Sequence, residues 1–328
     1  MNKPPYRIER HLTPESRAAA LRRDVRAGLT AAPKWLPPWL LYDAAGSALF
    51  DKITELPEYY PTRTERAILA AHAGEIAAAS RARVLVELGS GSCDKTRLLL
   101  DALRAAGTLR RYVPVDVSDA ALTGASQRLL AGYPGLAIRA VQADFGQYLG
   151  LPPSSGGRQL VAFLGSTIGN MVPSERARFL ARLRASMAGG DLLLLGADLV
   201  KDPAMLVAAY DDGAQVTAAF NLNVLAVLNR ELGAGFDLDG FDHTVTWDAR
   251  REWIEMRLRA AWAQSVPVPA LGLTVEFAAG EELRTEVSAK FHQSILEAEL
   301  AAAGFDMRSW WTDPDGLYAL CLSVPDIR

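Results

Sequence analysis

The chain has 328 residues, of which 50% are hydrophobic and 22% are charged, and its formal net charge is -3. This composition is typical of a globular protein with a large core, and the length allows two domains. Because basic and acidic residues nearly balance, no nucleic-acid partner is expected. Two cysteines give no disulfide framework, and neither an apolar leader nor a run of membrane-spanning length occurs. We therefore expect a cytoplasmic protein with no membrane partner.

Strands and helices are predicted to alternate through the middle of the chain. A strand over 84–88 leads into Gly89-Ser90-Gly91 and a helix over 94–106. The further strands are predicted at 112–117, 138–144, 160–164 and 192–195, and the further helices at 118–130 and 174–187. Parallel strands need long crossover connections, which are usually helical. The alternation therefore predicts an α/β fold, with a doubly wound sheet covered by helices on both faces.

The pattern changes after residue 200. Residues 203–232 are predicted to be helical, whereas 243–287 favour long antiparallel strands. A helix over 294–303 and a strand over 317–324 then close the chain. We predict that the doubly wound domain comprises 64–199 plus 291–328, and that 1–63 plus 200–290 form a second, α+β lobe that binds the substrate.

Three strand ends of the predicted sheet carry residues suited to a nucleoside, and ligands of such sheets bind outside the carboxyl ends of the strands. Gly89 and Gly91 allow the backbone to approach a ligand closely, while the missing third glycine of the dinucleotide fingerprint argues against a pyrophosphate. Asp116 can accept hydrogen bonds from ribose hydroxyls, although helix capping is an alternative role. Asp144 and Phe145 suit an adenine ring. A methyl-donor nucleoside is favoured over a nicotinamide.

Five sequence strings are more specific than the spacing of single residues. They are Leu-Pro-Glu-Tyr-Tyr-Pro-Thr-Arg at 56–63, Leu-Gly-Ser-Thr-Ile-Gly-Asn at 164–170, Asp-Leu-Val-Lys-Asp at 198–202, Ala-Phe-Asn-Leu-Asn-Val-Leu at 219–225 and Thr-Glu-Val-Ser-Ala-Lys-Phe at 285–291. The chain resembles, from about residue 42 to its C-terminus, the histidine-specific Nα-methyltransferases of ergothioneine biosynthesis. The resemblance implies a class I methyltransferase-like, Rossmann-like domain with a second lobe that closes over an amino acid.

The resemblance also implies the reaction. Members of this family use three molecules of S-adenosyl-L-methionine to convert L-histidine into hercynine, its Nα-trimethyl betaine, and release S-adenosylhomocysteine. No metal takes part, and the four histidines of this chain show no ligand spacing. We expect a monomer whose partner is a small amino acid.

The residue roles implied by the resemblance fall into two groups. Donor contacts are implied at Tyr42, Gly89, Lys95, Asp116, Asp144 and Phe145. Substrate contacts are implied at Phe50, Tyr59, Asn170, Tyr210, Met256, Glu286 and Ser288, with Tyr59 and Asn170 at the reacting amine. One departure is Cys93, at a donor-loop position where relatives tend to carry serine.

The chemistry of these residues fits methyl transfer to an amine. The attacking amine must be unprotonated, and a carboxylate bonded to it would favour the ammonium form, so the neutral side chains of Tyr59 and Asn170 are suitable. Glu286 and Ser288 alternate along a predicted strand and therefore share one face, where they can hold the two nitrogens of an imidazole. Without the resemblance, a solvent-facing strand would be the simpler interpretation.

Three other functions stay open at this stage. The same scaffold can act on another free amino acid such as tryptophan, and a small or apolar residue in place of Glu286 would favour that reading. A methyltransferase of RNA or protein is disfavoured by the near-neutral composition. A degenerate donor-binding module that only mediates interactions is disfavoured by the intact Asp116, Asn170, Glu286 and Ser288.

Overall fold

The computed structural model describes residues 6–91, 93, 95–144, 146, 148–149, 151–152 and 157–326. The chain divides into two compact units. Unit 1 contains the described residues of 1–12, 61–200 and 291–328, and unit 2 contains 13–60 and 201–290. Across the described part of the chain, every helix is too short or too polar to cross a membrane.

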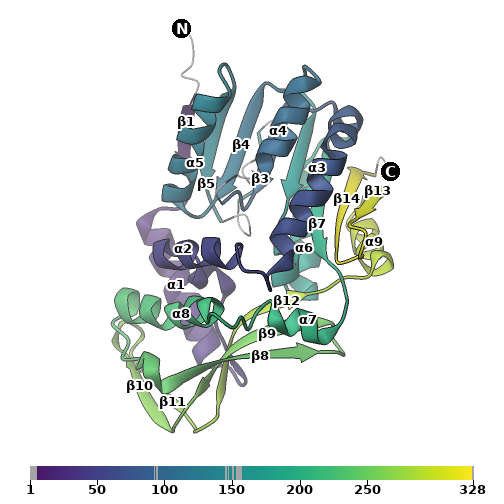
Figure 1. The fold of residues 1–328 in the computed structure, drawn as a ribbon. Coiled ribbons are helices and arrows are strands. Elements are labelled where there is room, and N and C mark those ends of the chain that lie inside the picture. The colour runs from purple at the N-terminus through teal and green to yellow at the C-terminus, as the bar shows by residue number, and fades with distance from the viewer. Residues whose placement is uncertain are drawn as a thin grey trace. The chain divides into compact units, whose positions relative to one another are not determined.

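Unit 1 is built on one large sheet (Figure 1). Its strands are β1 (Tyr6–Arg10), β3 (Val84–Leu88), β4 (Arg111–Asp116), β5 (Ala137–Gln142), β6 (Gln159–Phe163), β7 (Leu192–Asp198), β13 (Phe305–Thr312) and β14 (Tyr318–Pro325). Its helices are α3 (Tyr60–Ser80), α4 (Thr96–Ala105), α5 (Asp119–Gly132), η3 (Thr167–Asn170), α6 (Pro173–Ser186) and α9 (Gln293–Ala302).

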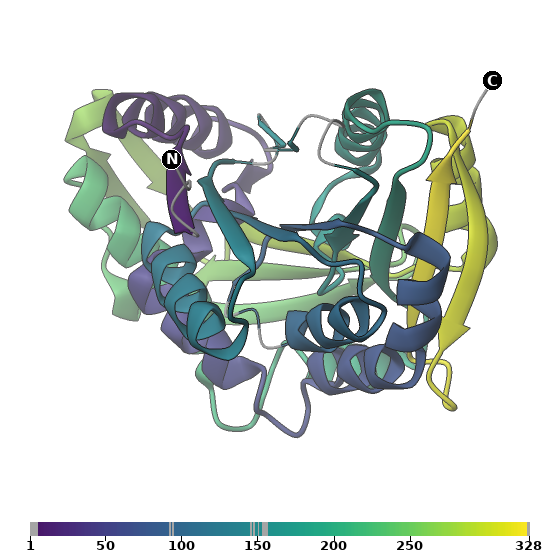
Figure 2. The same cartoon turned by 90° about the horizontal axis from the view of Figure 1, so that it is seen from above.

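The strand order of this sheet is β1-β5-β4-β3-β6-β7-β14-β13. The strands from β1 to β7 pair in parallel, and only the last two pairings, β7 with β14 and β14 with β13, are antiparallel. Figure 2 shows α4 and α5 on one face of the sheet and α6 on the other. Every residue of β3, β6 and β7 is buried, as expected for strands covered on both faces. The predicted doubly wound α/β sheet is confirmed.

Two strands of this sheet differ from the sequence prediction. Tyr6–Arg10 was placed in the second lobe with the rest of 1–63, but β1 pairs with β5, with Tyr6 opposite Ile138. Strand β13, which holds Trp310 and Trp311, was not predicted at all. Strand β1 lies at one edge of the sheet and pairs with residues about 130 positions away, which local sequence does not reveal, whereas β13 lies at the other edge and forms a hairpin with β14, the strand that follows it.

Unit 2 combines a four-stranded sheet with packed helices. The sheet has the order β2-β12-β9-β8, and a separate ribbon pairs β10 with β11. The strands are β2 (Lys34–Trp35), β8 (Phe241–Asp248), β9 (Trp253–Ala260), β10 (Gln264–Val268), β11 (Leu273–Phe277) and β12 (Glu282–Ala289). The helices are α1 (Pro14–Leu29), η1 (Pro38–Leu41), α2 (Ala44–Ile53), α7 (Pro203–Ala208), α8 (Val216–Leu232), η4 (Leu238–Gly240) and η5 (Pro269–Leu271).

The helical stretch predicted over 203–232 is broken in the structure. Helix α7 ends at Ala208 and α8 begins at Val216, with Gln215 in the left-handed region at a φ of 59°. The buried Asp212 carboxylate accepts hydrogen bonds from the backbone N–H groups of Val216 and Thr217, at 2.9 and 2.7 Å. Such an acceptor satisfies the free N–H groups of a helix start. The break places Tyr210 in a turn.

Candidate functional site

The glycine turn after β3 lies beside the end of β4. Gly89 and Gly91 have φ angles of 71° and 48°, which favour glycine. The Asp116 carboxylate accepts from the Gly91 N–H at 3.0 Å and from the Ser118 N–H at 2.9 Å. Burial raises the pKa of Asp116 against these backbone hydrogen bonds. Each carboxylate oxygen retains a second acceptor position, so this turn suits the ribose hydroxyls of a nucleoside.

A second polar centre in unit 1 surrounds the buried carboxylate of Glu65. Its Oε1 accepts from the Gly165 N–H and from the Tyr318 hydroxyl, both at 2.8 Å, and its Oε2 accepts from the Lys95 ammonium. A Cβ on Gly196 would lie 2.1 Å from Oε1, so only glycine leaves room for this carboxylate. Glu65 thereby fixes both Lys95 and the start of the 164–170 string.

The sequence prediction missed Glu65. A signal was present, because Glu65 precedes the buried Ile68 and Leu69 by three and four residues in α3 and so shares their face of the helix. A carboxylate on an apolar helix face needs buried partners.

Cys93 lies against a buried network under the glycine turn. The Glu87 carboxylate accepts from the Thr96 hydroxyl at 2.6 Å and from the Tyr112 hydroxyl, and the Cys93 sulfur lies 3.1 Å from that Tyr112 oxygen. Burial raises the pKa of Glu87 to about 7 and that of the Cys93 thiol to about 12. The cysteine is thus a buried, protonated packing residue of the turn.

The remaining site residues predicted in unit 1 belong to segments that follow β5 and β6 in the sequence. Asp144 follows β5, and its carboxylate accepts from the Gly146 N–H at 2.8 Å. Phe145, predicted as a donor contact, lies outside the described residues. Asn170 is half-buried at the end of η3. Just before η3, Ser166 has a left-handed φ of 56°, and its hydroxyl accepts from the Asp198 N–H at 2.9 Å.

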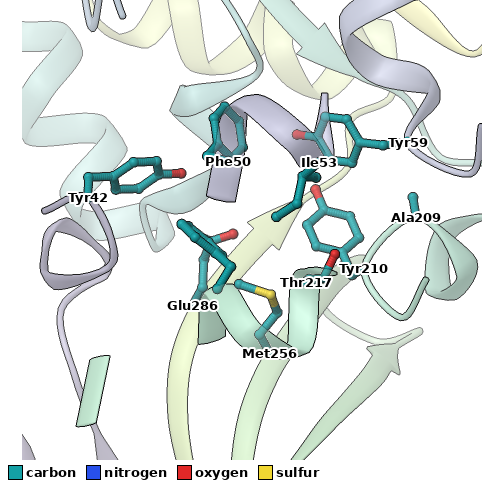
Figure 3. A pocket seen from close by; sticks show the side chains of 10 residues that line it. Tyr42, Phe50, Ile53, Tyr59, Ala209, Tyr210, Thr217, Met256 and Glu286 are labelled. Atoms are coloured by element: carbon teal, nitrogen blue, oxygen red, sulfur yellow. The ribbon is translucent and has the colours of Figure 1, made fainter. Parts of the chain in front are cut away.

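Unit 2 contains a small hollow (Figure 3). Its lining comes from α2 and the segments around it, from the turn and start of α8, and from β9 and β12. The lining residues are Tyr42, Phe50, Ile53, Tyr59, Ala209, Tyr210, Thr217, Phe220, Met256 and Glu286. Every one of them except Glu286 is uncharged.

Aromatic rings make up half of this lining. The ring centroids are 5.6 Å apart for Tyr42 and Phe50, 6.1 Å for Phe50 and Tyr59, and 6.2 Å for Tyr59 and Tyr210, each pair packed edge to face. Phe220 lies 5.5 Å from Tyr42 and 5.9 Å from Phe50. Ring faces attract cations through their quadrupoles, most strongly where water is excluded. The hollow therefore suits a small ligand that carries positive charge.

Glu286 is the one acid of the hollow. Its side chain is buried, and its Oε2 has no hydrogen-bond partner among the described residues. Burial raises the pKa of Glu286 to about 8, against the nearby positive charge of Lys290. A buried polar atom without a partner costs free energy unless a ligand or water satisfies it. The carboxyl is therefore available to a ligand in the hollow.

Two residues further along β12, Ser288 joins a buried cluster. Its Oγ lies 2.8 Å from the Tyr210 hydroxyl, and the Lys290 ammonium donates to both oxygens, at 2.8 Å to Ser288 and 3.0 Å to Tyr210. The Lys290 Nζ also lies 4.7 Å from the centroid of the Tyr210 ring. The sequence prediction named Ser288 and Tyr210 but missed Lys290, although the 285–291 string contains it.

Asn221, the first of the two asparagines in the 219–225 string, fixes the framework behind the hollow. Thr285 donates to the Asn221 side-chain oxygen at 2.5 Å, and the Asn221 amide lies 2.8 Å from His243 Nδ1. His243 Nε2 lies 2.9 Å from the Tyr210 carbonyl oxygen, which can only accept, so Nε2 carries the proton and Nδ1 accepts from Asn221. Burial lowers the pKa of His243 and so favours this neutral ring. These bonds hold the turn that presents Tyr210.

The structure brings most of the predicted substrate residues together. Phe50, Tyr59, Tyr210, Met256 and Glu286 line the hollow, and Ser288 is bonded to Tyr210. Tyr42, predicted as a donor contact, lines the same hollow, while Asn170 belongs to unit 1. The lining residues that were not predicted are Ile53, Ala209, Thr217 and Phe220. They are apolar or small residues on α2, directly after α7 and on α8.

Known proteins similar to this chain agree in their description. The family model of SAM-dependent, histidine-specific methyltransferases matches residues 21–325. Histidine N-alpha-methyltransferases of Mycolicibacterium smegmatis and Mycobacterium tuberculosis are 58% and 55% identical to this chain over 317 residues. These residues cover 97% of this chain and 98% of each relative. Ergothioneine biosynthesis protein 1 of Neurospora crassa is 31% identical over 300 residues, which cover 89% of this chain and 33% of that protein. The chain belongs to the family of SAM-dependent, histidine-specific methyltransferases.

Proposed function

We propose that this protein transfers methyl groups from S-adenosyl-L-methionine to the α-amino group of L-histidine, three times, and so forms hercynine for ergothioneine biosynthesis. The family match and the two mycobacterial relatives support the substrate and the donor. The observation that carries the proposal is the buried Oε2 of Glu286, which has no hydrogen-bond partner within the described chain. Glu286 lines the hollow together with five aromatic residues.

The polar groups of the hollow match an imidazole ring. Glu286 accepts from one ring N–H, and the Ser288–Tyr210 hydroxyl pair meets the second ring nitrogen. Tryptophan has a single ring N–H and no second ring nitrogen, so it would leave the hydroxyl pair without a partner. Sites built to pair a polar ring discriminate strongly against analogues that lack one of its polar atoms. Histidine is therefore favoured over tryptophan.

Most of the proposed contacts to the methyl donor belong to unit 1, and Tyr42 belongs to unit 2. S-adenosyl-L-methionine supplies an electrophilic methyl group. Asp116 would accept from the ribose hydroxyls, Gly89 would allow close approach of the backbone, and Asp144 would accept from the adenine amino group. Lys95, which Glu65 holds in place, would contact the amino acid end of the donor. Tyr42 and Phe145 complete the proposed donor contacts.

The attacking amine is assigned neutral partners. Tyr59 and Asn170 can bond to an amine without stabilising its protonated form as a carboxylate would. The rings of Phe50, Tyr59 and Phe220 accommodate the permanent positive charge of the trimethylated product. Positioning of two bound reactants is the main contribution that such a displacement needs from the protein.

A panel of free amino acids with isotope-labelled methyl donor tests this function. We expect label in histidine alone, and mass spectrometry should show products with one, two and finally three added methyl groups. Preferential labelling of tryptophan would contradict the assigned substrate, and a product that stops at one methyl would contradict the betaine. Donor binding without transfer to any amino acid would favour a degenerate binding module.

We further propose that the protein is a cytoplasmic monomer. Both cysteines are buried free thiols, which suits a reducing compartment. Sedimentation at micromolar concentration tests the oligomeric state, and a mass twice that of the 35.5 kDa chain would contradict it.

A further inference from the structure

Lys290 is a buried lysine of unit 2 that bonds to Tyr210, a residue that lines the hollow. Only 3% of its surface is exposed, and it follows Glu286 and Ser288 at two-residue intervals. Its ammonium donates to the hydroxyl oxygens of Ser288 and Tyr210, at 2.8 and 3.0 Å. A lysine this deeply buried is unusual in folded proteins, because burial disfavours its charge. Its burial and its two hydrogen bonds therefore suggest that Lys290 acts on the ligand site.

The role of Lys290 follows from the hydrogen bonds at the Ser288 hydroxyl. A serine hydroxyl has one hydrogen to donate and two lone pairs that accept. One lone pair of Ser288 accepts from Lys290, and the other accepts from Tyr210 when the more acidic phenol donates across their 2.8 Å contact. Both lone pairs of Ser288 are then filled, and its hydrogen is left for a ligand. Without the ammonium, a lone pair of Ser288 would be open and the hydroxyl could also accept.

We propose that Lys290 is a positioning residue for substrate specificity, which makes the Ser288–Tyr210 pair a hydrogen-bond donor towards the ligand ring. The proposal rests on the proposed histidine function. In this proposal Glu286 is ionised once a ring N–H binds it and only accepts at the other polar position, so the hollow selects a ring with one N–H and one bare nitrogen, which is the neutral form of imidazole. The ammonium also offsets the charge of Glu286 when that carboxyl is ionised.

Two ligands separate this role from simple support of the fold. L-histidine has a ring N–H and a bare ring nitrogen, whereas β-(pyrrol-2-yl)alanine has the N–H but no bare nitrogen. We expect the wild-type protein to bind histidine more tightly than the pyrrole analogue by calorimetry. In Lys290→Met the ratio of the two dissociation constants should fall about tenfold, chiefly because histidine binds more weakly. An unchanged ratio, or an equal loss for both ligands, would overturn the proposal.

A double-mutant cycle tests whether Lys290 acts through the hydroxyl. In Ser288→Ala, the further change Lys290→Met should alter the ratio by less than about twofold, because the group that the lysine orients is gone. A full tenfold effect in that background would contradict the assigned route. If Lys290→Met fails to fold by circular dichroism, Lys290→Gln replaces it and should give a smaller fall in the same ratio.

The matched control is Lys34→Met in the same unit. Lys34 pairs with Glu281 and lies 4.9 Å from the centroid of the Phe277 ring, and it does not line the hollow. This variant should keep the wild-type ratio. If the wild-type protein fails to bind histidine, the proposed function is wrong. If it binds histidine with a ratio insensitive to Lys290, only the present inference is wrong.

Discussion

The polar groups of unit 1 and those of the hollow in unit 2 differ in how far the fold satisfies them. Asp116 accepts two backbone N–H groups, and Glu65 accepts from three donors. Glu286 is also buried, yet its Oε2 lacks any partner in the described chain. A carboxylate that already has hydrogen-bond partners in the ligand-free protein holds the binding surface in one conformation. A buried carboxyl without a partner destabilises the ligand-free protein, and a ligand that bonds to it therefore gains more binding free energy. We therefore assign substrate choice to unit 2.

The largest effect should come from the pH dependence of stability. Because the folded pKa of Glu286 is about 8 and its ordinary value is 4.5, the folded state holds a proton that the unfolded state releases between these values. Wild-type stability should therefore fall as pH rises from about 4.5 to 8, by at most about 1.4 kcal/mol per pH unit for this group. Glu286→Gln, which mimics the protonated carboxyl, should be increasingly more stable than wild type over that range.

Thermal melts of both ligand-free proteins at pH 5 and pH 8 measure this difference. Glu87, whose pKa is raised to about 7, gives a slope of the same sign and is present in both proteins. A constant gap in melting temperature between them would mean that Glu286 is ionised in the empty hollow.

The second largest effect is expected from Asp116→Ala, which should weaken binding of the donor and leave binding of the substrate unchanged. Loss of two hydrogen bonds to a charged acceptor should weaken binding of S-adenosylhomocysteine by about 3 kcal/mol, roughly a hundredfold, and leave histidine binding unchanged. Calorimetry with each ligand alone provides both numbers. Asp119→Ala is the matched control, because Asp119 is exposed and pairs with Arg10. The reverse order of effects would mean that the ends of the site are assigned wrongly.

Glu286→Ala should give the complementary result in unit 2. Histidine binding should weaken by about 1 to 3 kcal/mol because a buried hydrogen bond to the ring is lost, while S-adenosylhomocysteine binding stays as in wild type. Glu276→Ala serves as control, since Glu276 is exposed on β11 and its carboxylate accepts from the Ser265 hydroxyl. Undiminished histidine affinity in Glu286→Ala would remove the specificity argument.

The smallest effect is expected from the aromatic lining. Phe50→Leu keeps an apolar side chain but removes a ring that packs against both Tyr42 and Tyr59. Loss of one cation–π partner should weaken binding of the trimethylated product by about 0.5 to 1 kcal/mol. Competition between hercynine and histidine should then shift towards histidine. A proportionate loss for both ligands would indicate a general packing defect instead.

The sequence predicted the central sheet well because its signals are local. Buried strands such as Val84–Leu88, turn glycines such as Gly89 and capping residues such as Ser118 lie within a few residues of what they determine. The edge strand Tyr6–Arg10 was missed for the opposite reason, since it depends on pairing with residues about 130 positions away. The break in 203–232 was missed because Asp212 caps α8 from within a stretch of helical periodicity.

The site residues likewise fall into those that the sequence identified and those that only the tertiary structure revealed. The amino-acid sequence alone determined the α/β fold, the turns that suit a methyl donor and, through the five strings, the family and the identity of Glu286 and Ser288. Only the tertiary structure decided that Glu65 holds Lys95, that Lys290 donates to Ser288 and Tyr210, and that one oxygen of Glu286 lacks a partner among the residues with described positions. Periodicity specifies which face of a helix or strand a residue occupies, whereas burial and hydrogen bonding depend on what distant segments bring to that face.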